Sequence, residues 1–287
     1  MVTTDDFKSD FPNQWCPGCG NFGILDAMKS ALAGLNLSPE KIFVVSGIGQ
    51  AAKAPHFLEC NCFHSLHGRA LPVATGAKLA NHDMTVLVNT GDGDCYAEGG
   101  NHFMHAIRRN IDLTVLVHNN GVYGLTKGQA SPTTMLGMRT KSQPDGVITA
   151  PFNPLSVALA LGAGFVARGF SGDADQLRDL IQAGIRHRGF ALIDILQPCV
   201  SFNHVNTHQW YRERVEKIGT AYDTSDREAA LALSMRKNDR IPTGIFYRQK
   251  NETYTDRIHK LKHGSLTDCR YDPKPLREIL HRHEAAW

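Results

Sequence analysis

Several features that would place this chain in other protein classes are missing. No apolar run approaches the roughly 20 residues that a helix needs to span a bilayer. The first residues, Met1 to Phe11, are acidic and polar, so they match neither a secretory signal nor an arginine-rich transit peptide. A charge excess is also missing, because the formal net charge of the 287 residues is only +3. These absences favour a cytoplasmic protein that binds neither nucleic acid nor membrane.

The cysteine content argues against a disulfide framework. The chain has seven cysteines, an odd number, and no export signal, so its thiols are expected to stay reduced. Any cysteines that cluster should therefore bind a metal or carry out redox chemistry, whereas Cys95 and Cys269 are expected to be free thiols. The 14 histidines add no metal site, because none stands in an H-E-x-x-H or similar spacing.

The order of the hydrophobic segments predicts an α/β fold. Short apolar or β-branched runs are typical of buried parallel strands, and helical patterns lie between them. The expected strands are Ile42–Val45, Thr85–Val88, Leu113–Val117 and Ala191–Leu196, and the expected helices are Gly23–Leu35, Leu71–Ala80, Gly99–Arg109, Pro154–Leu161 and Ala174–His187. This alternation predicts a doubly wound, mostly parallel sheet with helices on both faces. Two segments rich in turn-forming residues, Ser46–Gly68 and Gly121–Pro151, are expected to be ordered loops.

The composition of the chain changes near residue 200, where charged residues become frequent and apolar runs become rare. Residues 1–200 are expected to form the main domain, and residues 201–287 a strongly charged C-terminal extension. The extension has few apolar runs apart from Ile218–Tyr222 and Ile241–Tyr247. We expect it to be irregular and to wrap the main domain or a partner subunit rather than to hold a core of its own.

Two polar motifs directly follow neighbouring predicted strands. Gly91, Asp92, Gly93 and Asp94 follow one strand, and an Asn-Asn pair at residues 119–120 follows the next. Either motif alone is more often a turn, but the carboxyl ends of parallel strands are where α/β sheets bind ligands. Mg²⁺ prefers hard oxygen ligands completed by phosphate oxygens, and glycines let a backbone approach phosphates closely. The pair therefore predicts a magnesium–diphosphate site, with the Asp92 carboxylate, the Asn120 amide and the backbone carbonyl of Val122 as metal ligands.

The paired motifs resemble the signature of thiamine-diphosphate enzymes, and further segments narrow the family. The chain is similar to the beta subunits of 2-oxoacid:ferredoxin oxidoreductases at residues 15–23, 46–49, 66–70, 120–133, 196–199 and 241–247. The resemblance implies a thiamine-diphosphate-binding fold and a partner alpha subunit. It also implies oxidative decarboxylation of a 2-oxoacid, 2-oxoglutarate before pyruvate, to acyl-CoA and CO₂, with electrons passing through a [4Fe-4S] cluster to ferredoxin.

The same resemblance implies roles for individual residues. The cofactor is expected to lie against the Gly-Asp-Gly-Asp motif and against Gly47, Ile48, Gly49, His67, Asn120, Val122, Gly124 and Leu125. Lys53 and Leu125 are expected near the substrate, and Lys127 near the phosphates of coenzyme A or the substrate carboxylate. Without the resemblance, Lys53 and Lys127 would be read as solvated surface lysines. The glutamate that activates the aminopyrimidine and the arginine that binds the substrate are expected on the partner chain.

The iron–sulfur ligands are where the sequence departs from the family. A four-iron cluster needs four thiolates. On the resemblance, Cys16, Cys19 and Cys199 supply three of them. The fourth ligand is expected directly after Ser-Gly-Ile-Gly, where this chain has Gln50.

Three readings of the vacant position stay open. Cys60 is the expected replacement, with Cys62 or an incomplete set of ligands as the alternatives. Other functions also compete with the redox enzyme: a non-redox thiamine-diphosphate lyase, or a binding module with structural zinc at the same cysteines. A thioredoxin-like dithiol is disfavoured because no strand pattern precedes the Cys-x-x-Cys motif.

Overall fold

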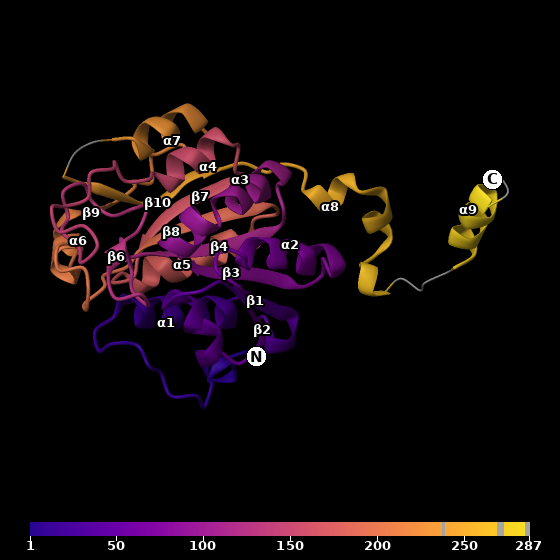
Figure 1. Ribbon diagram of the computed structural model, residues 1–287, viewed down its shortest axis with the longest axis horizontal. Coiled ribbons are helices and arrows are strands. Elements are labelled where there is room, and N and C mark those ends of the chain that lie inside the picture. Colours follow the sequence, from indigo (N-terminus) through magenta and orange to yellow (C-terminus); the bar gives the residue numbers. More distant parts are fainter. Residues whose placement is uncertain (237–238, 269–272, 285–287) are drawn as a thin grey trace.

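An eight-stranded sheet runs through the middle of the computed structural model (Figure 1), which describes residues 1–236, 239–268 and 273–284. Its strand order is β2-β1-β3-β4-β8-β7-β10-β9, and only the β7–β10 pairing is antiparallel. The strands are β1 (Ile42–Ser46), β2 (Asn61–His64), β3 (Thr85–Gly91), β4 (Leu113–Asn119), β7 (Phe165–Phe170), β8 (Phe190–Leu196), β9 (Val215–Lys217) and β10 (Ile241–Arg248). The hairpin strands β5 (Val122–Tyr123) and β6 (Gln129–Ala130) stand apart.

Helices cover both faces of the sheet, so the expected doubly wound fold is confirmed. On one face, α1 (Gly20–Gly34) and α5 (Ala174–Arg186) contribute to one hydrophobic core. On the other face, α2 (Ala70–Ala80), α3 (Gly100–Arg109), α4 (Pro154–Ala160) and α7 (Arg227–Ser234) contribute to a second core. The central strand β8 is buried along its whole length, as expected for a parallel strand with helices on both sides. Within the described residues, no helix combines the length and apolarity needed to cross a bilayer.

The structure corrects two expectations from the sequence and adds one strand that the sequence did not predict. The segment expected as a loop at Ser46–Gly68 contains a 3₁₀-helix, η3 (Ala51–Phe57), and the edge strand β2. Strand β7 was not predicted from the sequence, because Arg168 interrupts its apolar run. In the structure Arg168 forms an ion pair with Asp194, with 3.2 Å between Nε and Oδ2. The extension after residue 200 is not irregular throughout, since it supplies α6 (His208–Arg214), β9, α7 and β10.

The extension also reaches into the core of the main domain. Phe246 and Tyr247 of β10, together with Ala230 of α7, pack in the same hydrophobic core as α2 and α3. Strand β10 lies next to the edge strand β9, and its buried residues come in two pairs, Pro242–Thr243 and Phe246–Tyr247.

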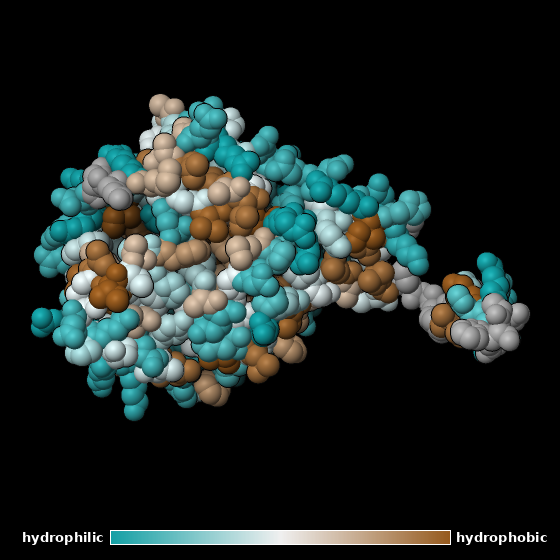
Figure 2. Space-filling model, turned by 45° about the horizontal axis from the view of Figure 1, so that its top comes forward, coloured by the Kyte–Doolittle hydropathy of each residue, from teal (hydrophilic) through white to brown (hydrophobic). Residues whose placement is uncertain are grey.

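The last part of the chain extends away from the body of the molecule (Figure 1). It contains α8 (Tyr254–Arg257), η5 (His259–His263), η6 (Leu266–Asp268) and α9 (Lys274–Glu284). Leu276, Ile279 and Leu280 of α9 are each at least half exposed, and their spacing places them on one helix face, where Figure 2 shows apolar surface beside polar surface. Cys269, one of the expected free thiols, lies outside the described residues.

Candidate functional site

The sequence motifs meet because four neighbouring parallel strands end at the same edge of the sheet. Strands β1, β3, β4 and β8 are adjacent and run in the same direction. The Ser-Gly-Ile-Gly segment starts at the last residue of β1, and the Gly-Asp-Gly-Asp motif starts at the last residue of β3. The Asn-Asn pair starts at the last residue of β4, and Cys199 follows β8. Carboxyl ends of parallel strands form the usual ligand-binding edge of an α/β sheet.

A pocket at this edge, called here the Asp92 pocket, gathers most of the expected cofactor residues. It is lined by Ile48, Gly49, Gln50, Ala51, His67, Gly91, Asp92, Gly93, Asp94, Asn120, Val122, Tyr123, Gly124, Leu125 and Thr126. Lys53, on η3, and the exposed Lys127 do not line it. Of the three residues expected near the substrate or coenzyme A, the structure therefore brings only Leu125 to the pocket.

Asp92 is a buried carboxylate held in a fixed orientation. It is 1% exposed, and its Oδ2 accepts hydrogen bonds from the Ser131 hydroxyl at 2.6 Å, the main-chain N–H of Gly121 at 3.2 Å and the Thr133 hydroxyl. Burial raises the pKa of Asp92 to about 6, although the Ser131 and Thr133 hydroxyls act in the opposite direction. A bound cation would favour the ionised form of such a carboxyl group.

Asn120 and Val122 complete a set of hard oxygen donors beside Asp92. The Asn120 amide oxygen accepts a hydrogen bond from the N–H of Val122 at 3.0 Å, which closes a tight turn after β4. An amide oxygen has two lone pairs, so a second acceptor site remains. A carboxylate, an amide oxygen and a backbone carbonyl are the kinds of ligand that Mg²⁺ takes together with phosphate oxygens. The donor set thus fits the expected metal.

Asp94 lines the Asp92 pocket and also links the segments around it. Its carboxylate accepts hydrogen bonds from the N–H groups of Ile48 at 3.1 Å and Gly68 at 2.8 Å, and from the Thr90 hydroxyl at 2.6 Å. These donors belong to three separate segments of the chain. Asp94 therefore ties the walls of the pocket together. Gly47 is part of this arrangement, because a Cβ at residue 47 would lie 1.8 Å from Asp94 Oδ2.

We expect Gly47→Ala to weaken the pocket through this contact. The added methyl group would displace the Asp94 carboxylate, and overpacking of this kind costs about 1–3 kcal/mol. Gly76→Ala is the matched control, because Gly76 is exposed in α2 and a Cβ there would have no atom of the described part of the chain within 4 Å. Thermal unfolding of both variants checks the prediction, and it is wrong if the two variants unfold at the same temperature.

Gly49 leaves open space in the Asp92 pocket, because it has no side chain there. Its φ of +113° lies in a region that side chains rarely adopt, and among the residues that the structure describes no heavy atom lies within 4 Å of the Cβ that another residue would place there. Since Gly49 lines the Asp92 pocket, a side chain would project into open space. The backbone at this turn is therefore able to approach a bound group closely.

His67, Glu98 and Tyr123 lie together beside Asp94. His67 Nδ1 is 2.7 Å from Asp94 Oδ1, a distance that fits an ion pair, although the angle does not fit a hydrogen bond. The Tyr123 hydroxyl donates to both Glu98 oxygens, at 3.1 and 3.2 Å. The pKa of Tyr123 is raised, first by burial and then by the Glu98 charge. Tyr123 stays neutral at physiological pH and acts as a hydrogen-bond donor.

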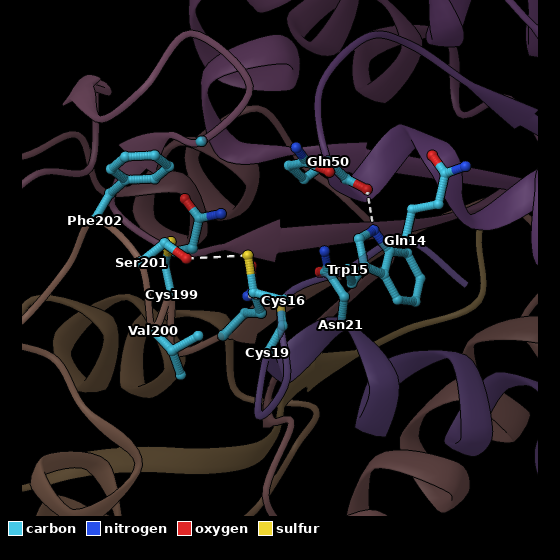
Figure 3. Close-up of a pocket in the computed structure, with 13 residues that line it drawn as sticks. Gln14, Trp15, Cys16, Cys19, Asn21, Gln50, Cys199, Val200, Ser201 and Phe202 are labelled. Atoms are coloured by element: carbon cyan, nitrogen blue, oxygen red, sulfur yellow. Dashed lines mark hydrogen bonds between the residues drawn. The ribbon is translucent and has the colours of Figure 1, made fainter. Parts of the chain in front are cut away.

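Three of the cysteines, Cys16, Cys19 and Cys199, line a second pocket, called here the cysteine pocket (Figure 3). It is lined by Gln14, Trp15, Cys16, Cys19, Asn21, Gln50, Asn120, Gly124, Gln197, Cys199, Val200, Ser201 and Phe202. The Ser201 hydroxyl donates to Cys16 Sγ at 3.0 Å, and Gln197 Nε2 donates to Cys19 Sγ at 3.4 Å. Burial and the neighbouring cysteines raise the pKa of Cys19 to about 11. In the part of the chain that the structure describes, no three potential ligands already stand grouped around a single ion position.

The structure does not bring Cys60 to the cysteine pocket. Cys60 lies just before β2, with its Sγ 3.5 Å from Cys62 Sγ. Cys62 is opposite Val44 in the parallel β1–β2 pairing, so β2 holds both thiols beside the core that α1 and α5 cover. Gln50 itself lines the cysteine pocket together with Cys16, Cys19 and Cys199. The expected replacement by Cys60 is not what this arrangement presents.

The Asp92 pocket and the cysteine pocket share a wall. Gln50, Asn120 and Gly124 line both of them. A ligand in one pocket would therefore lie close to a ligand in the other. The sequence placed each motif at the edge of the sheet, but it gave no indication that these three residues separate two sites.

Other contributors to the site had no assigned role from the sequence. Ser131 and Thr133, which hold Asp92, lie in the segment that resembles the family, but hydroxyl residues carry no motif of their own. His118 is fully buried, with one ring nitrogen 2.8 Å from the Asn21 amide oxygen and the other 2.9 Å from that of Asn89. Burial lowers the pKa of His118 to about 3, so it is a neutral structural link beneath the cysteine pocket.

Comparison with known proteins agrees with this geometry. Residues 9–195 match the C-terminal TPP-binding domain of thiamine pyrophosphate enzymes, and residues 199–263 match the C-terminal part of the pyruvate ferredoxin oxidoreductase beta subunit. The 2-oxoacid:ferredoxin oxidoreductase subunit beta of Saccharolobus solfataricus is 48% identical over 260 residues, which cover 86% of this chain and 85% of that protein.

Two further relatives carry the name of a particular 2-oxoacid. The 2-oxoglutarate synthase subunit KorB of Methanocaldococcus jannaschii is 37% identical over 87% of this chain and 93% of its own length. A solved structure of 2-oxoglutarate:ferredoxin oxidoreductase from Magnetococcus marinus, with 2-oxoglutarate, coenzyme A and succinyl-CoA bound, superimposes with a TM-score of 0.92. It is 38% identical in sequence and covers 97% of this chain and 96% of the compared chain.

Proposed function

Because this chain belongs to the family of 2-oxoacid:ferredoxin oxidoreductase beta subunits, we propose that it carries the thiamine diphosphate and the iron–sulfur centre of such an enzyme. The enzyme would convert a 2-oxoacid and coenzyme A to acyl-CoA and CO₂. The observation that carries the proposal is the wall of Gln50, Asn120 and Gly124 between the two pockets. It would place a decarboxylation site next to an electron acceptor.

The residues of the Asp92 pocket are suited to hold Mg²⁺ and a diphosphate. Asp92, Asn120 and the carbonyl of Val122 would bind the metal, while Asp94 keeps the surrounding loops in place through its three hydrogen bonds. When bound, thiamine diphosphate supplies the electron sink that a 2-oxoacid needs to lose CO₂. The protein's contribution is to bind and orient it and to exclude water from the buried end of the pocket.

The cysteine pocket is suited to one-electron chemistry. Cys16, Cys19 and Cys199 offer three thiolates, and an iron–sulfur cluster held by them would supply one-electron transfer to ferredoxin. The hydrogen bonds from Ser201 and Gln197 reach two of the sulfur atoms. Such bonds offset negative charge on the sulfurs and raise the reduction potential.

Each of the two alternative functions, a non-redox thiamine-diphosphate lyase and a structural zinc module, accounts for only one of the two pockets. A non-redox thiamine-diphosphate lyase has no use for the three cysteines beside its cofactor. A module with structural zinc has no use for the buried carboxylate of Asp92. Both pockets have a use in an oxidoreductase that joins decarboxylation to electron transfer.

The catalytic base is expected on the partner subunit. Both carboxylates that line the Asp92 pocket are committed: Asp92 to Ser131, Thr133 and Gly121, and Asp94 to the surrounding loops. Proton removal from the thiamine ring needs a carboxylate at the aminopyrimidine. The alpha subunit would supply it, along with an arginine for the substrate carboxylate. Coenzyme A and ferredoxin complete the proposed set of partners.

The substrate is proposed to be 2-oxoglutarate. Its name appears among the relatives that cover most of this chain, and the Magnetococcus marinus enzyme binds it in the solved structure. We expect the complex with the alpha subunit to reduce ferredoxin with a higher kcat/KM for 2-oxoglutarate than for pyruvate, and the isolated chain to be inactive because it lacks the base. Steady-state kinetics of the complex measure the two kcat/KM values, and the same assay on the isolated chain measures its residual activity.

Two outcomes would contradict these expectations separately. Equal or higher kcat/KM for pyruvate would overturn the substrate but not the reaction. Decarboxylation of either 2-oxoacid by the isolated chain would show that a base lies on this chain. A preparation heated before assay is the control for enzyme-independent decarboxylation.

A further inference from the structure

The position that lacks a cysteine is occupied by a residue with an unpaired buried group. Gln50 lines the cysteine pocket with Cys16, Cys19 and Cys199 (Figure 3). Its side-chain oxygen, Oε1, is buried and has no hydrogen-bond partner among the residues that the structure describes. A buried acceptor without a donor is destabilising. Such an atom in a pocket lined by thiols indicates a position where a bound group would meet it.

Gln50 is held firmly at this position. The indole N–H of Trp15 donates to its main-chain carbonyl at 2.8 Å. Trp15 is 6% exposed and packs edge-on against Phe57, with ring centroids 4.8 Å apart. The backbone of Gln50 is thus fixed next to Cys16, the residue that follows Trp15. Moving another residue into its place would require this packing to open.

The two nearest candidate thiols in the sequence are held elsewhere. The N–H of Glu59, the residue before Cys60, donates to the carbonyl of Phe7 at 3.2 Å. Cys62 is fixed in β2 by its pairing with β1. Delivering Cys60 to the cysteine pocket would break the first contact and disturb the second. Neither thiol is positioned as a fourth ligand.

We infer that the cluster of this chain has three thiolate-bound corners and a fourth iron that faces Gln50 without a cysteine ligand. The inference rests on the proposed function. An amide oxygen is a neutral, hard donor, whereas iron in a sulfide cluster prefers soft, anionic thiolate. The fourth iron is therefore the most weakly held. The cluster also carries one negative charge less than a four-cysteine cluster, which raises its reduction potential.

Mild oxidation of the heteromeric complex tests the inference directly. One electron passes from the cluster to ferricyanide, which becomes ferrocyanide, and one Fe²⁺ leaves the unprotected corner. We expect the iron content to fall from four to three per chain, with the electron paramagnetic resonance signal of an oxidised three-iron cluster. In Gln50→Cys, a fourth thiolate should keep all four irons under the same treatment and shift the reduction potential downward.

The outcomes separate this inference from the proposed function. A wild-type complex that keeps four irons as well as Gln50→Cys does would overturn the inference and leave the function intact. Wild type is itself informative, even if Gln50→Cys fails to fold. Zinc in place of iron would instead overturn the iron–sulfur part of the proposed function. Cys60→Ser is the control, and it should oxidise like wild type. If wild type kept four irons while Cys60→Ser fell to three, Cys60 would be the fourth ligand.

Discussion

Asp92→Ala is expected to abolish the binding of Mg²⁺ and thiamine diphosphate. The substitution removes the only formal charge among the three proposed metal ligands. It also leaves the Ser131 hydroxyl and the Gly121 N–H without their acceptor. Loss of one member of a buried charge pair costs about 3–5 kcal/mol, which corresponds to at least about a hundredfold in affinity. Isothermal titration calorimetry of the purified complex measures the affinity for thiamine diphosphate in the presence of Mg²⁺.

The cofactor-free protein provides the control for folding. Burial raises the pKa of Asp92 to about 6 from its usual 3.8, so the folded state holds this proton more tightly than the unfolded state. The associated stability is present at low pH and is lost as the pH rises through about 6. At pH 7, relief of the buried charge in Asp92→Ala offsets the loss of its hydrogen bonds with Ser131, Thr133 and Gly121, so the variant should unfold within a few degrees of wild type. Asn120→Ala should weaken cofactor binding less, because it removes a neutral ligand. Unchanged cofactor affinity in Asp92→Ala would refute the site.

Cys199→Ser is expected to remove the iron–sulfur centre while leaving thiamine diphosphate binding intact. Cys199 follows the central strand β8 and is 9% exposed, so it has little freedom to be replaced by another ligand. Serine differs by one atom and preserves the packing of Cys199 with Val122 and Met138. Metal analysis and visible absorbance should show lost iron and bleaching, and ferredoxin reduction should stop.

Cys60→Ser is the matched comparison for this second prediction. Both substitutions exchange sulfur for oxygen, but Cys60 lies outside the cysteine pocket beside Cys62. Iron content and ferredoxin reduction should therefore match wild type in Cys60→Ser. If Cys199→Ser retained its iron while Cys60→Ser lost it, the assignment of the ligands would have to be reversed.

Much of the fold follows from local patterns along the chain. The strands at residues 42, 85, 113 and 190 begin within a residue of their predicted positions, because continuous apolar runs mark buried parallel strands. Strand β7 escaped prediction because Arg168 looks like a surface residue until Asp194 is seen beside it. Strand β10 was expected as an apolar run but not as a strand, because Pro242 and Gly244 interrupt its pattern.

The site shows the same division between local signals and distant contacts. Asp92 and Asn120 are adjacent because their strands are neighbours, and the strand order follows from an ordinary crossover. The role of Asp94 was not visible, because its donors lie up to 46 residues away in the chain. Ser131 is 39 residues from the carboxylate that it holds.

The sequence by itself determined the family, the α/β sheet and the set of residues at its ligand-binding edge, because each of these leaves a signal within one segment. Only the tertiary structure decided which of those residues share a pocket. It kept Cys60 just before the edge strand β2, left Lys53 and Lys127 outside the Asp92 pocket, and made Gln50 part of the lining of both pockets. The physical reason is that pockets form where side chains from separate segments pack together, and that packing depends on contacts that no single segment encodes.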